Sequence, residues 1–235
     1  GRIVDTSGRH SLKSLTLSNG QKIFADCLAV SGGWNPNVHL TSHQGCHPVW
    51  RDDIAAFVPG KNLPVGMSVA GAARGSMTLE EALREGSEAA KLATEELGFS
   101  TPSQRLPQTK NEGYNITAFW RVKESSKRSW IDLQNDVTTK DVQLAHQEGF
   151  RSVEHLKRYT TLGMGTDQGK TSSVLGLAIL AEYNNKSISD TGTTSFRPPY
   201  TPVSIGAFVG QSLGKDFRPV RLTPSHNWAV EQGAV

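Results

Sequence analysis

The chain has 235 residues, of which 36% are hydrophobic and 20% are charged, and its formal net charge at pH 7 is +3. This composition excludes an intrinsically disordered chain, and the small net charge argues against a nucleic-acid-binding protein. No apolar run approaches the roughly 18 residues of a membrane-spanning helix. Two cysteines, Cys27 and Cys46, are too few for a disulfide scaffold. We therefore expect a globular cytoplasmic protein with no nucleic-acid or membrane partner.

Residues 10–30 have the pattern of a hairpin that leads into a buried strand. Leucines precede Asn19-Gly20, which is a strong signal for a tight hairpin turn. Residues 23–30 then form an apolar run, which predicts that this strand is buried.

The next segment reads as a strand, a glycine loop and a helix. Residues 65–70 are apolar and predict a second strand, which leads into the glycine-containing loop 70–75. A Thr-x-x-Glu capping box and a terminating glycine predict a helix over residues 78–97. This order of elements is typical of an α/β unit.

The second half of the chain has a different pattern. Residues 99–128 lack periodicity and are interpreted as a connector with a short strand at 116–122. Capping residues and apolar spacing then predict short helices at about 140–148, after Ser152 and at 173–184. Residues 188–202, which contain three prolines, are predicted to be extended.

The glycine loop 70–75 is a candidate nucleotide site. Glycine allows the backbone to approach a cofactor closely, and the start of the following helix offers free N–H groups. The complete G-x-G-x-x-G pattern is absent, so the first half of a dinucleotide domain would lie before residue 1. Because the chain begins with Gly1 and carries no signal peptide, we expect it to be a fragment of a longer protein.

Four residues, His39, His43, Cys46 and His47, resemble a metal-binding cluster. A glycine and a proline lie within or beside the cluster, and no further ligands lie at a fitting distance. We interpret these residues as solvated loop side chains and predict no metal. The chain also lacks a Ser–His–Asp or Cys–His pattern, so we assign no catalytic residue.

Two segments, 157–161 and 167–172, combine cations, hydroxyls and a helix start. This composition suits a phosphate group, although helix capping explains the same residues. Met164 stands where a P-loop would need glycine, which argues against a nucleoside triphosphatase.

Several longer motifs resemble the alpha subunit of heterotetrameric sarcosine oxidase. They are DLQNDVT at 132–138, GFRSVEHLKRYT at 149–160, DQGKT at 167–171 and GTTSFRPPYTPV at 192–203. SGGWNPNVHL at 31–40 and VAGAARG at 69–75 resemble the nucleotide-binding domain of the same family, and residues 222–235 resemble the entry into its folate-binding domain.

The resemblance implies a complex with beta, gamma and delta subunits. Sarcosine would be oxidised at FAD in the beta subunit, electrons would pass to FMN at the alpha–beta interface and then to oxygen, and the one-carbon unit would go to tetrahydrofolate. The alpha subunit would also bind NAD, and the isolated fragment would be inactive. We predict NAD contacts from Gly71, Ala72, Gly75, Met77 and Leu79, and FMN contacts from Arg158, Thr160, Thr161, Lys170, Thr171 and Ser172.

Two departures from related families refine this prediction. FAD-binding relatives of the nucleotide domain carry Gly-Asp where this chain has Gly71-Ala72, which favours NAD over FAD. The helical module resembles ferredoxin-associated domains that bind a two-iron cluster through four cysteines. The matching residues are Asp132, Gln134, Asp167 and Ser172, so we predict that the iron–sulfur cluster has been lost.

The predicted fold class is α/β plus α, with a partial Rossmann-like domain, a small helical module and an extended linker. The segments are 1–98 for the dinucleotide-binding part, 99–128 for the connector, 129–186 for the helical module, 187–225 for the Pro-rich segment and 226–235 for the start of an aminomethyltransferase-like domain. The alternatives are the alpha-type subunit of an amine or opine dehydrogenase or a hydrogen cyanide synthase-like complex, and a non-catalytic docking scaffold.

Overall fold

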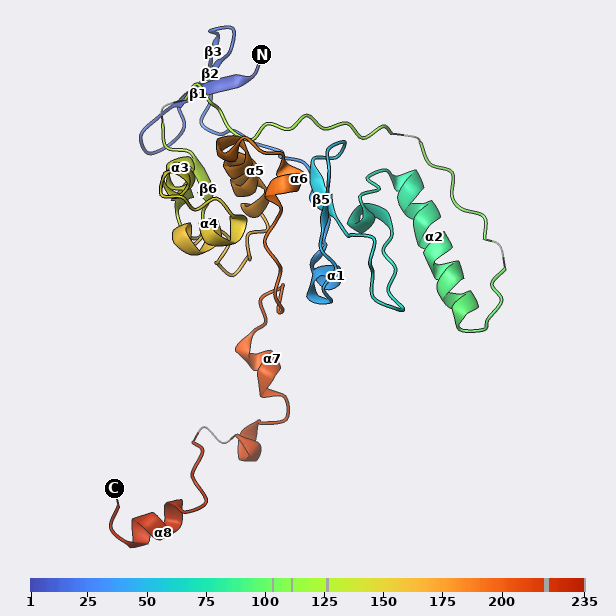
Figure 1. The fold of residues 1–235 in the computed structure, drawn as a ribbon, viewed down its shortest axis with the longest axis vertical. Coiled ribbons are helices and arrows are strands. Elements are labelled where there is room, and N and C mark those ends of the chain that lie inside the picture. Colours follow the sequence, from blue (N-terminus) through green and yellow to red (C-terminus); the bar gives the residue numbers. More distant parts are fainter. Residues whose placement is uncertain (103, 111, 126, 218–219, 235) are drawn as a thin grey trace. The chain divides into compact units, whose positions relative to one another are not determined.

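The structure is a computed structural model that describes residues 1–102, 104–110, 112–125, 127–217 and 220–234. The chain divides into two compact units, Gly1–Tyr200 and Thr201–Val235. The first unit contains both strands and helices, which confirms the mixed α/β class (Figure 1). The specific prediction of a partial Rossmann-like domain is not confirmed, because the described strands pair in small antiparallel sheets.

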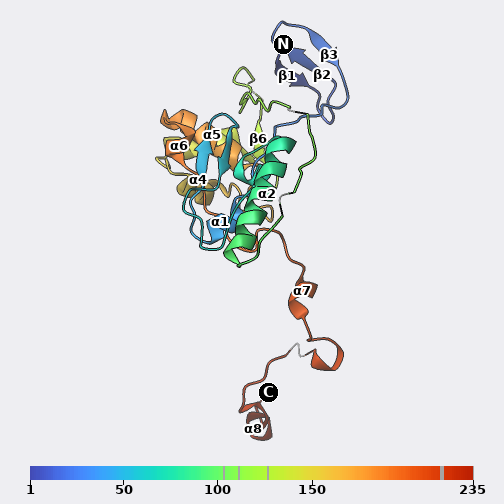
Figure 2. The same ribbon diagram turned by 90° about the vertical axis from the view of Figure 1, so that its right-hand side faces the viewer.

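The N-terminal sheet consists of β1 (Ile3–Ser7), β2 (Ser14–Leu17) and β3 (Lys22–Phe24), in that order and all antiparallel (Figure 2). The predicted hairpin turn is confirmed, since Gly20 has a φ of 83° and donates its N–H to the Leu17 carbonyl. The prediction of a buried strand over 23–30 is wrong. β3 ends at Phe24, whose side chain is 79% exposed, because nothing in the described residues covers this edge of the sheet.

A second hairpin pairs β4 (Val49–Arg51) with β5 (Ala56–Val58), after the short helix α1 (His39–His43). β5 is fully buried, and its Ala56 and Val58 form a small core with Ile54, against which Met77 and Tyr114 pack. Neither this hairpin nor α1 is predicted by the sequence pattern.

The predicted strand at 65–70 does not form. Val65 is fully exposed, and the following residues Gly71–Arg74 form the short 3-10 helix η1. Apolar composition alone does not make a strand when no neighbouring strand offers hydrogen bonds. The short strand predicted at 116–122 is also absent from the described residues.

Helix α2 (Leu79–Glu96) matches the prediction closely. The Thr78 hydroxyl accepts a hydrogen bond from Glu81 N, and Gly98 after the helix has a φ of 83°. No residue of α2 is buried, however, and Leu79 is 63% exposed. The apolar side of this helix is therefore only partly covered within the part of the chain that the structure describes.

The helical module contains the main core. Its elements are β6 (Trp130–Asp132), β7 (Val137–Thr138), α3 (Thr139–Gln147), α4 (Val153–Thr160), α5 (Ser173–Asn184) and α6 (Ile188–Thr191). The three predicted helices are confirmed as α3, α4 and α5. The prediction that residues 188–202 are extended is wrong at the start of this range, because α6 occupies Ile188–Thr191.

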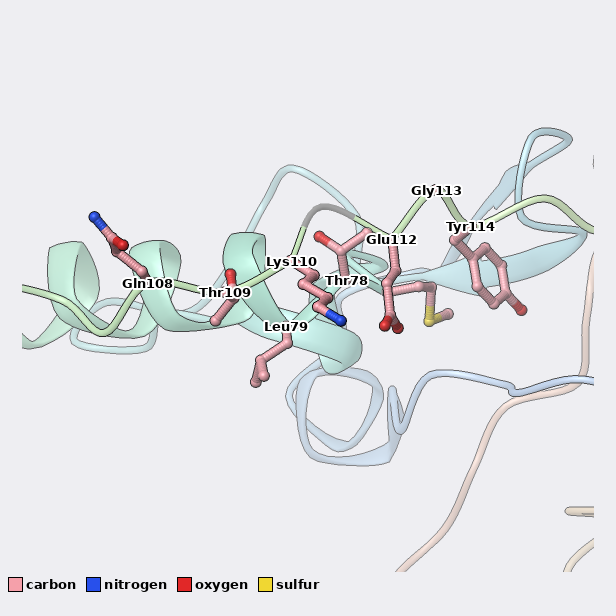
Figure 3. Close-up of a pocket in the computed structure, with 9 residues that line it drawn as sticks. Thr78, Leu79, Gln108, Thr109, Lys110, Glu112, Gly113 and Tyr114 are labelled. Carbon is pink, nitrogen blue, oxygen red and sulfur yellow. The ribbon is translucent and has the colours of Figure 1, made fainter.

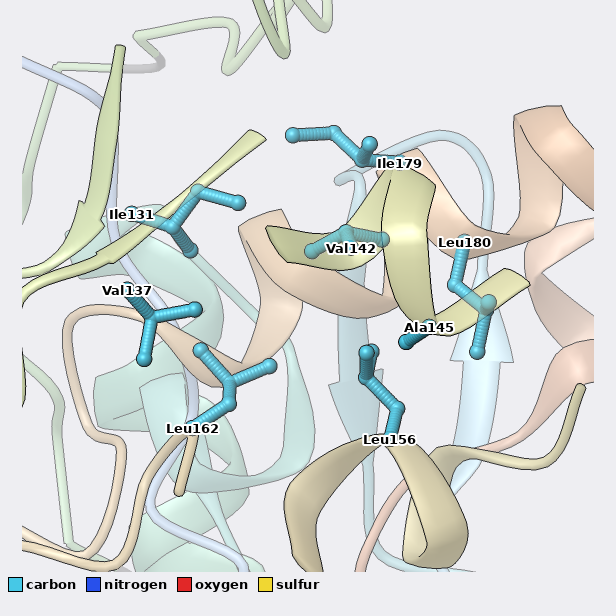
Figure 4. Packing of buried hydrophobic residues seen from close by; sticks show 8 residues of the cluster. All are labelled: Ile131, Val137, Val142, Ala145, Leu156, Leu162, Ile179 and Leu180. Atoms are coloured by element: carbon cyan, nitrogen blue, oxygen red, sulfur yellow. The ribbon is translucent and has the colours of Figure 1, made fainter. Parts of the chain in front are cut away.

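Helix α5 lies at the centre of this module. Six consecutive residues, 176–181, are buried, as expected for a helix that is apolar on all sides. Figure 4 shows the surrounding cluster, which consists of Ile131, Val137, Val142, Ala145, Leu156, Leu162, Ile179 and Leu180.

The second unit contains α7 (Ile205–Val209), the 3-10 helix η2 (Gly214–Asp216) and α8 (His226–Glu231). None of the helical residues of α7 or α8 is buried, and Phe208 is 74% exposed. This unit therefore has no core of its own in the described residues. None of the described helices is long and apolar enough to cross a membrane.

Candidate functional site

The glycine loop 70–75 packs tightly against the hairpin of β4 and β5. Gly75 has a φ of 95°, and a Cβ atom there would lie 2.7 Å from Val58 Cγ1 and 3.0 Å from Ile54 Cδ1. Glycine is thus required at position 75 both by backbone conformation and by packing. The close approach in this loop is to the protein's own core, which is a structural reason for the glycine.

We expect Gly75→Ala to lower the free energy of unfolding by about 1–3 kcal/mol, because the new methyl group meets two core side chains. Gly98→Ala is the matched control. Gly98 has a similar φ of 83° but nothing within 4 Å of its Cβ position, so it isolates the backbone strain. Urea unfolding followed by circular dichroism measures both variants. Equal losses would show that packing at Gly75 contributes nothing.

A carboxylate from α2 ties the glycine loop down. Glu85 accepts a hydrogen bond from Gly71 N at 2.9 Å and another from the Ser76 hydroxyl at 2.7 Å. Burial raises the pKa of Glu85, but these bonds, with Arg74 and Arg84 nearby, outweigh it and hold the pKa below its ordinary value. The Gly71 N–H is therefore already used and does not face a ligand phosphate.

A cavity of about 400 Å³ lies at the start of α2 (Figure 3). Two of the five residues predicted to bind NAD, Met77 and Leu79, line it, whereas Gly71, Ala72 and Gly75 do not. The remaining lining comes from Thr78 and from the connector: Gln108, Thr109, Lys110, Glu112, Gly113 and Tyr114. The sequence pattern assigns no role to these connector residues, since their segment has no periodicity and matches no motif.

The residues predicted to bind FMN come from two neighbouring segments. Arg158, on α4, contacts the Glu154 carboxylate at 3.1 Å. The hydroxyls of Thr160 and Thr161 donate to backbone carbonyls of Leu156 and Thr160. In this structure all three side chains have local partners.

The other three predicted FMN residues lie at the start of α5. The Lys170 ammonium donates to the Tyr200 carbonyl at 3.0 Å and lies 4.2 Å from the centre of its ring. The Thr171 hydroxyl donates to Asp167. Ser172, the N-cap residue, is fully buried but makes no capping bond. Helix α5 thus begins without a side-chain cap, although the N–H of its first residue, Ser173, donates to the Gly169 carbonyl at 2.8 Å.

Lys170 also lines a second cavity of about 110 Å³. Its walls come from four parts of the first unit: the segment before α1, strand β5, the start of α5 and the segment that leads to Tyr200. The lining residues are Asn35, Pro36, Asn37, Val38, Phe57, Gly169, Lys170, Ser173, Val174, Thr193, Phe196 and Tyr200.

The residues that match cluster-binding cysteines in the resembling domains lie in or beside one polar network. Asp132 is 1% exposed, and its carboxylate accepts hydrogen bonds from the N–H groups of Gln134, Asn135 and Gly163 at 2.8, 3.1 and 2.8 Å. The Gln134 side chain in turn accepts from Asp167 N at 3.4 Å.

Burial raises the pKa of Asp132, but the three backbone donors, with the Ser172 hydroxyl nearby, outweigh it and hold the pKa below its ordinary value. Ser172 thus lies beside the same network, although its hydroxyl makes no close hydrogen bond within the described residues. Carboxylate, amide and hydroxyl groups stand where an iron–sulfur cluster would need thiolates. The network ties the turn after β6 to the loop that precedes α5.

The interpretation of His39 and His43 as solvated loop residues is wrong. Both lie in α1, and the His39 ring stacks on Tyr200 with 3.9 Å between ring centres. His39 Nδ1 and His43 Nε2 are buried and have no hydrogen-bond partner in the part of the chain that the structure describes. Among the described residues, no group of three or more His, Cys, Asp or Glu side chains could hold a metal ion.

Burial, together with His43 and Lys170, lowers the pKa of His39. The fold therefore favours the neutral ring. The stabilising effect of the neutral His39 ring should be present above the ordinary histidine pKa of about 6.5 and should be lost as the pH falls through and below that value.

We expect His39→Phe, which keeps an aromatic ring against Tyr200, to reduce the fall in urea midpoint between pH 7.5 and pH 5. His10→Phe, at an exposed position, is the control, and an unchanged pH dependence in His39→Phe would contradict the assignment.

The helical module matches a domain family found in known proteins. Residues 126–211 match the sarcosine oxidase A3 domain family. The chain is 40% identical over 99% of its length to the alpha subunit of sarcosine oxidase from Rhizobium meliloti and 37% identical over 93% of its length to that from Corynebacterium sp. strain P-1. It spans about a quarter of the length of these relatives, 24% and 23% respectively.

More distant similarities extend to other oxidoreductases. The chain is 24% identical over 79% of its length to an opine oxidase subunit of Rhizobium meliloti, of which it covers 44%. The crystal structure of L-proline dehydrogenase from P. horikoshii superposes with a TM-score of 0.66 at 19% identity, covering 87% of this chain and 43% of that one. This structural likeness shows a shared fold alone.

The identities of 37–40% over nearly the whole chain and the domain match over the helical module point to one family. The chain therefore belongs to the family of sarcosine oxidase alpha subunits, and its residues 126–211 form the A3 domain of that family.

Proposed function

We propose that this chain is part of the alpha subunit of a multi-subunit sarcosine oxidase. The complex would convert sarcosine to glycine with formation of peroxide and would transfer the one-carbon unit to tetrahydrofolate. The single observation that carries the proposal is the 40% identity to the alpha subunit of a sarcosine oxidase over 99% of this chain. Beta, gamma and delta subunits would be its partners, with FAD and tetrahydrofolate bound elsewhere in the complex.

The proposed contribution of the first unit is an NAD site at the start of α2. The cavity of about 400 Å³ falls within the size range of small-molecule sites, about 300–1,000 Å³. Thr109 lines the cavity, and its Oγ1 is buried with no hydrogen-bond partner among the described residues. Met77 and Leu79 would provide apolar contacts. Bound NAD would supply a nicotinamide able to accept hydride.

The proposed contribution of the helical module is one side of an FMN site. Lys170, beside the start of α5, fits the phosphate group of a flavin nucleotide, because a cation favours an anion. Five further residues stay predicted FMN contacts: Arg158, Thr160, Thr161, Thr171 and Ser172. Those that now bond to groups within the protein would have to exchange these partners for the cofactor. Bound FMN would supply a flavin that accepts and passes on electrons.

The test is the absorbance spectrum and the extracted nucleotides of the purified complex that contains this chain. Flavin together with NAD is the expected result. An iron–sulfur spectrum would instead favour an amine or opine dehydrogenase or a hydrogen cyanide synthase-like complex. The similarity to an opine oxidase subunit makes the opine-oxidising enzymes the second candidate. A colourless complex without bound nucleotide would instead indicate a non-catalytic docking scaffold.

A further inference from the structure

The segment 193–200, which we call the strap, contacts both parts of the helical module that are predicted to bind FMN. It lies within the motif GTTSFRPPYTPV at 192–203 and within the matched A3 domain, and the sequence pattern alone assigns it no function. Near its start, the Ser195 N–H donates to the Glu154 carboxylate at 3.4 Å, and that carboxylate contacts Arg158 at 3.1 Å. The strap thus binds to the ion pair on α4 that includes a predicted FMN residue.

The end of the strap is bound to the loop before α5. The Gln168 side chain donates to the Pro199 carbonyl, and the Lys170 ammonium donates to the Tyr200 carbonyl at 3.0 Å. The same ammonium lies 4.2 Å from the centre of the Tyr200 ring, which is a cation–π contact. Lys170 is therefore held by two different groups of one strap residue.

The Tyr200 ring is itself held by two other rings. His39 of α1 stacks on it with 3.9 Å between ring centres, and Phe196 of the strap packs edge-on with 5.3 Å between ring centres. The lowered pKa of His39 favours its neutral ring, so this neighbour does not repel the Lys170 ammonium. The position of the lysine thus depends on a chain of contacts that begins at α1.

We propose that the strap is a positioning element of the FMN site, in which Tyr200 holds the Lys170 ammonium in place for the flavin phosphate. The inference rests on the proposed FMN function and deepens it, because it assigns a role to Tyr200, which acts through Lys170. A free lysine side chain has many rotamers, and contacts that fix it in advance reduce the entropic cost of binding a phosphate. An ammonium has three N–H donors, so one bond to a carbonyl leaves others for phosphate oxygens.

The second cavity supports this role. Lys170, Phe196 and Tyr200 all line it, so the lysine and the strap face the same space. Its volume of about 110 Å³ is below the range of about 300–1,000 Å³ that is usual for small-molecule sites. It therefore suits one part of a nucleotide, such as the phosphate, better than a whole cofactor.

The test compares the binding of FMN with that of riboflavin, which lacks the phosphate, by the assembled complex after FMN has been removed. Fluorescence titration gives the dissociation constant of each flavin. Tyr200→Leu removes the ring and keeps the backbone carbonyl, and we expect it to weaken FMN binding about threefold or more while riboflavin binding is unchanged. Tyr200→Phe keeps the ring and should bind both flavins as the wild type does.

A double variant shows whether the effect passes through the lysine. In the Lys170→Met background there is no cation to position, so Tyr200→Leu should cause no further loss of FMN affinity. A general structural role of Tyr200 would instead weaken FMN binding by the same factor in both backgrounds, and would weaken riboflavin binding as well. Either result would overturn the inference.

Trp130→Leu is the matched control, because the Arg128 guanidinium lies over the Trp130 ring at 5.2 Å elsewhere in the same module. This variant should keep the FMN affinity of the wild type, and a loss equal to that of Tyr200→Leu would contradict a specific role of the strap. Gln168→Leu is a second test, since it removes the donor to the Pro199 carbonyl. It should weaken FMN binding but not riboflavin binding, and wild-type affinity would contradict the anchoring of the strap.

The outcomes separate this inference from the FMN proposal. If Lys170→Met weakens FMN binding but Tyr200→Leu leaves it unchanged or strengthens it, the strap does not position the lysine, and the FMN proposal stands. If the wild-type complex binds no FMN, or if Lys170→Met binds FMN as tightly as the wild type, the assignment of Lys170 to FMN fails and the inference fails with it.

Discussion

Replacing Asp132 with alanine should lower the free energy of unfolding by about 3 kcal/mol or more. The substitution leaves three backbone N–H groups without their acceptor, those of Gln134, Asn135 and Gly163. The bond from Gly163 N is buried and the other two are partly buried, and a buried donor that loses its partner costs about 1–3 kcal/mol. The loss should be large because the Asp132 side chain is almost completely buried and links two loops that frame the start of α5.

Urea unfolding of the purified chain measures this effect. Asp26→Ala, at an exposed carboxylate outside the helical module, is the control and should change stability by no more than about 0.5 kcal/mol. Asp132→Asn keeps the size of the side chain and should lie between alanine and wild type. A loss below about 1 kcal/mol for Asp132→Ala would contradict the structural role of the network.

The same carboxylate predicts a pH dependence. Its pKa in the fold is lowered, so its contribution is fully present above the ordinary aspartate pKa of about 3.9 and is lost as the pH falls through the lowered value. Wild type should therefore lose more stability than Asp132→Asn when the pH is lowered from 5 to 3. Parallel curves for the two proteins would show that Asp132 is not ionised in the fold.

Replacing Lys170 with alanine should weaken FMN binding by the assembled complex, raising the dissociation constant roughly 10- to 100-fold. A charge-assisted hydrogen bond contributes about 1.5–3 kcal/mol, and Lys170 is the cation beside the uncapped start of α5. Released flavin is measured by fluorescence after denaturation of the complex. Reduction of FAD by sarcosine should be unaffected, while electron transfer out of FAD should slow.

The contact of Lys170 with Tyr200 requires a second comparison, because the alanine variant also removes the bond to the Tyr200 carbonyl and the contact with its ring. Lys170→Met keeps most of the contact with the Tyr200 ring but not the charge, so this variant should lose FMN as the alanine variant does. Lys170→Arg keeps the charge and should retain FMN. Lys140→Ala, at an exposed position on α3, is the control. Normal FMN content in both uncharged variants would make Lys170 a structural residue.

Local signals in the sequence are sufficient for the four longest described helices. The sequence predicts α2, α3 and α4, because capping residues and terminating glycines act on their own chain neighbours. The Asn19-Gly20 turn is predictable for the same reason. The sequence predicts α5 from its apolar composition, since the expected cap at Ser172 does not form. The motifs of the A3 domain likewise identify the family without a structure.

Strands cannot be predicted in the same way. Residues 65–70 have strand-like composition but lack a pairing partner, while the hairpin of β4 and β5 forms in a segment whose sequence shows no strand signal. A strand depends on hydrogen bonds to another segment, and the sequence of one segment does not contain its neighbour. The burial of His39 escapes prediction for the same reason, since it depends on Tyr200, far away along the chain.

The residues of the candidate sites also divide into those that the sequence predicts and those that only the structure reveals. Composition alone singles out Lys170, Thr171 and Ser172, and the structure gathers them at one helix start. The wall formed by Lys110 and Glu112 is not predictable, because no local pattern marks an irregular segment that packs beside a helix. The sequence thus determined the four longest described helices, the family and the residue types available for binding. Tertiary packing decided which distant segments share a cavity, since only the folded chain brings them into contact.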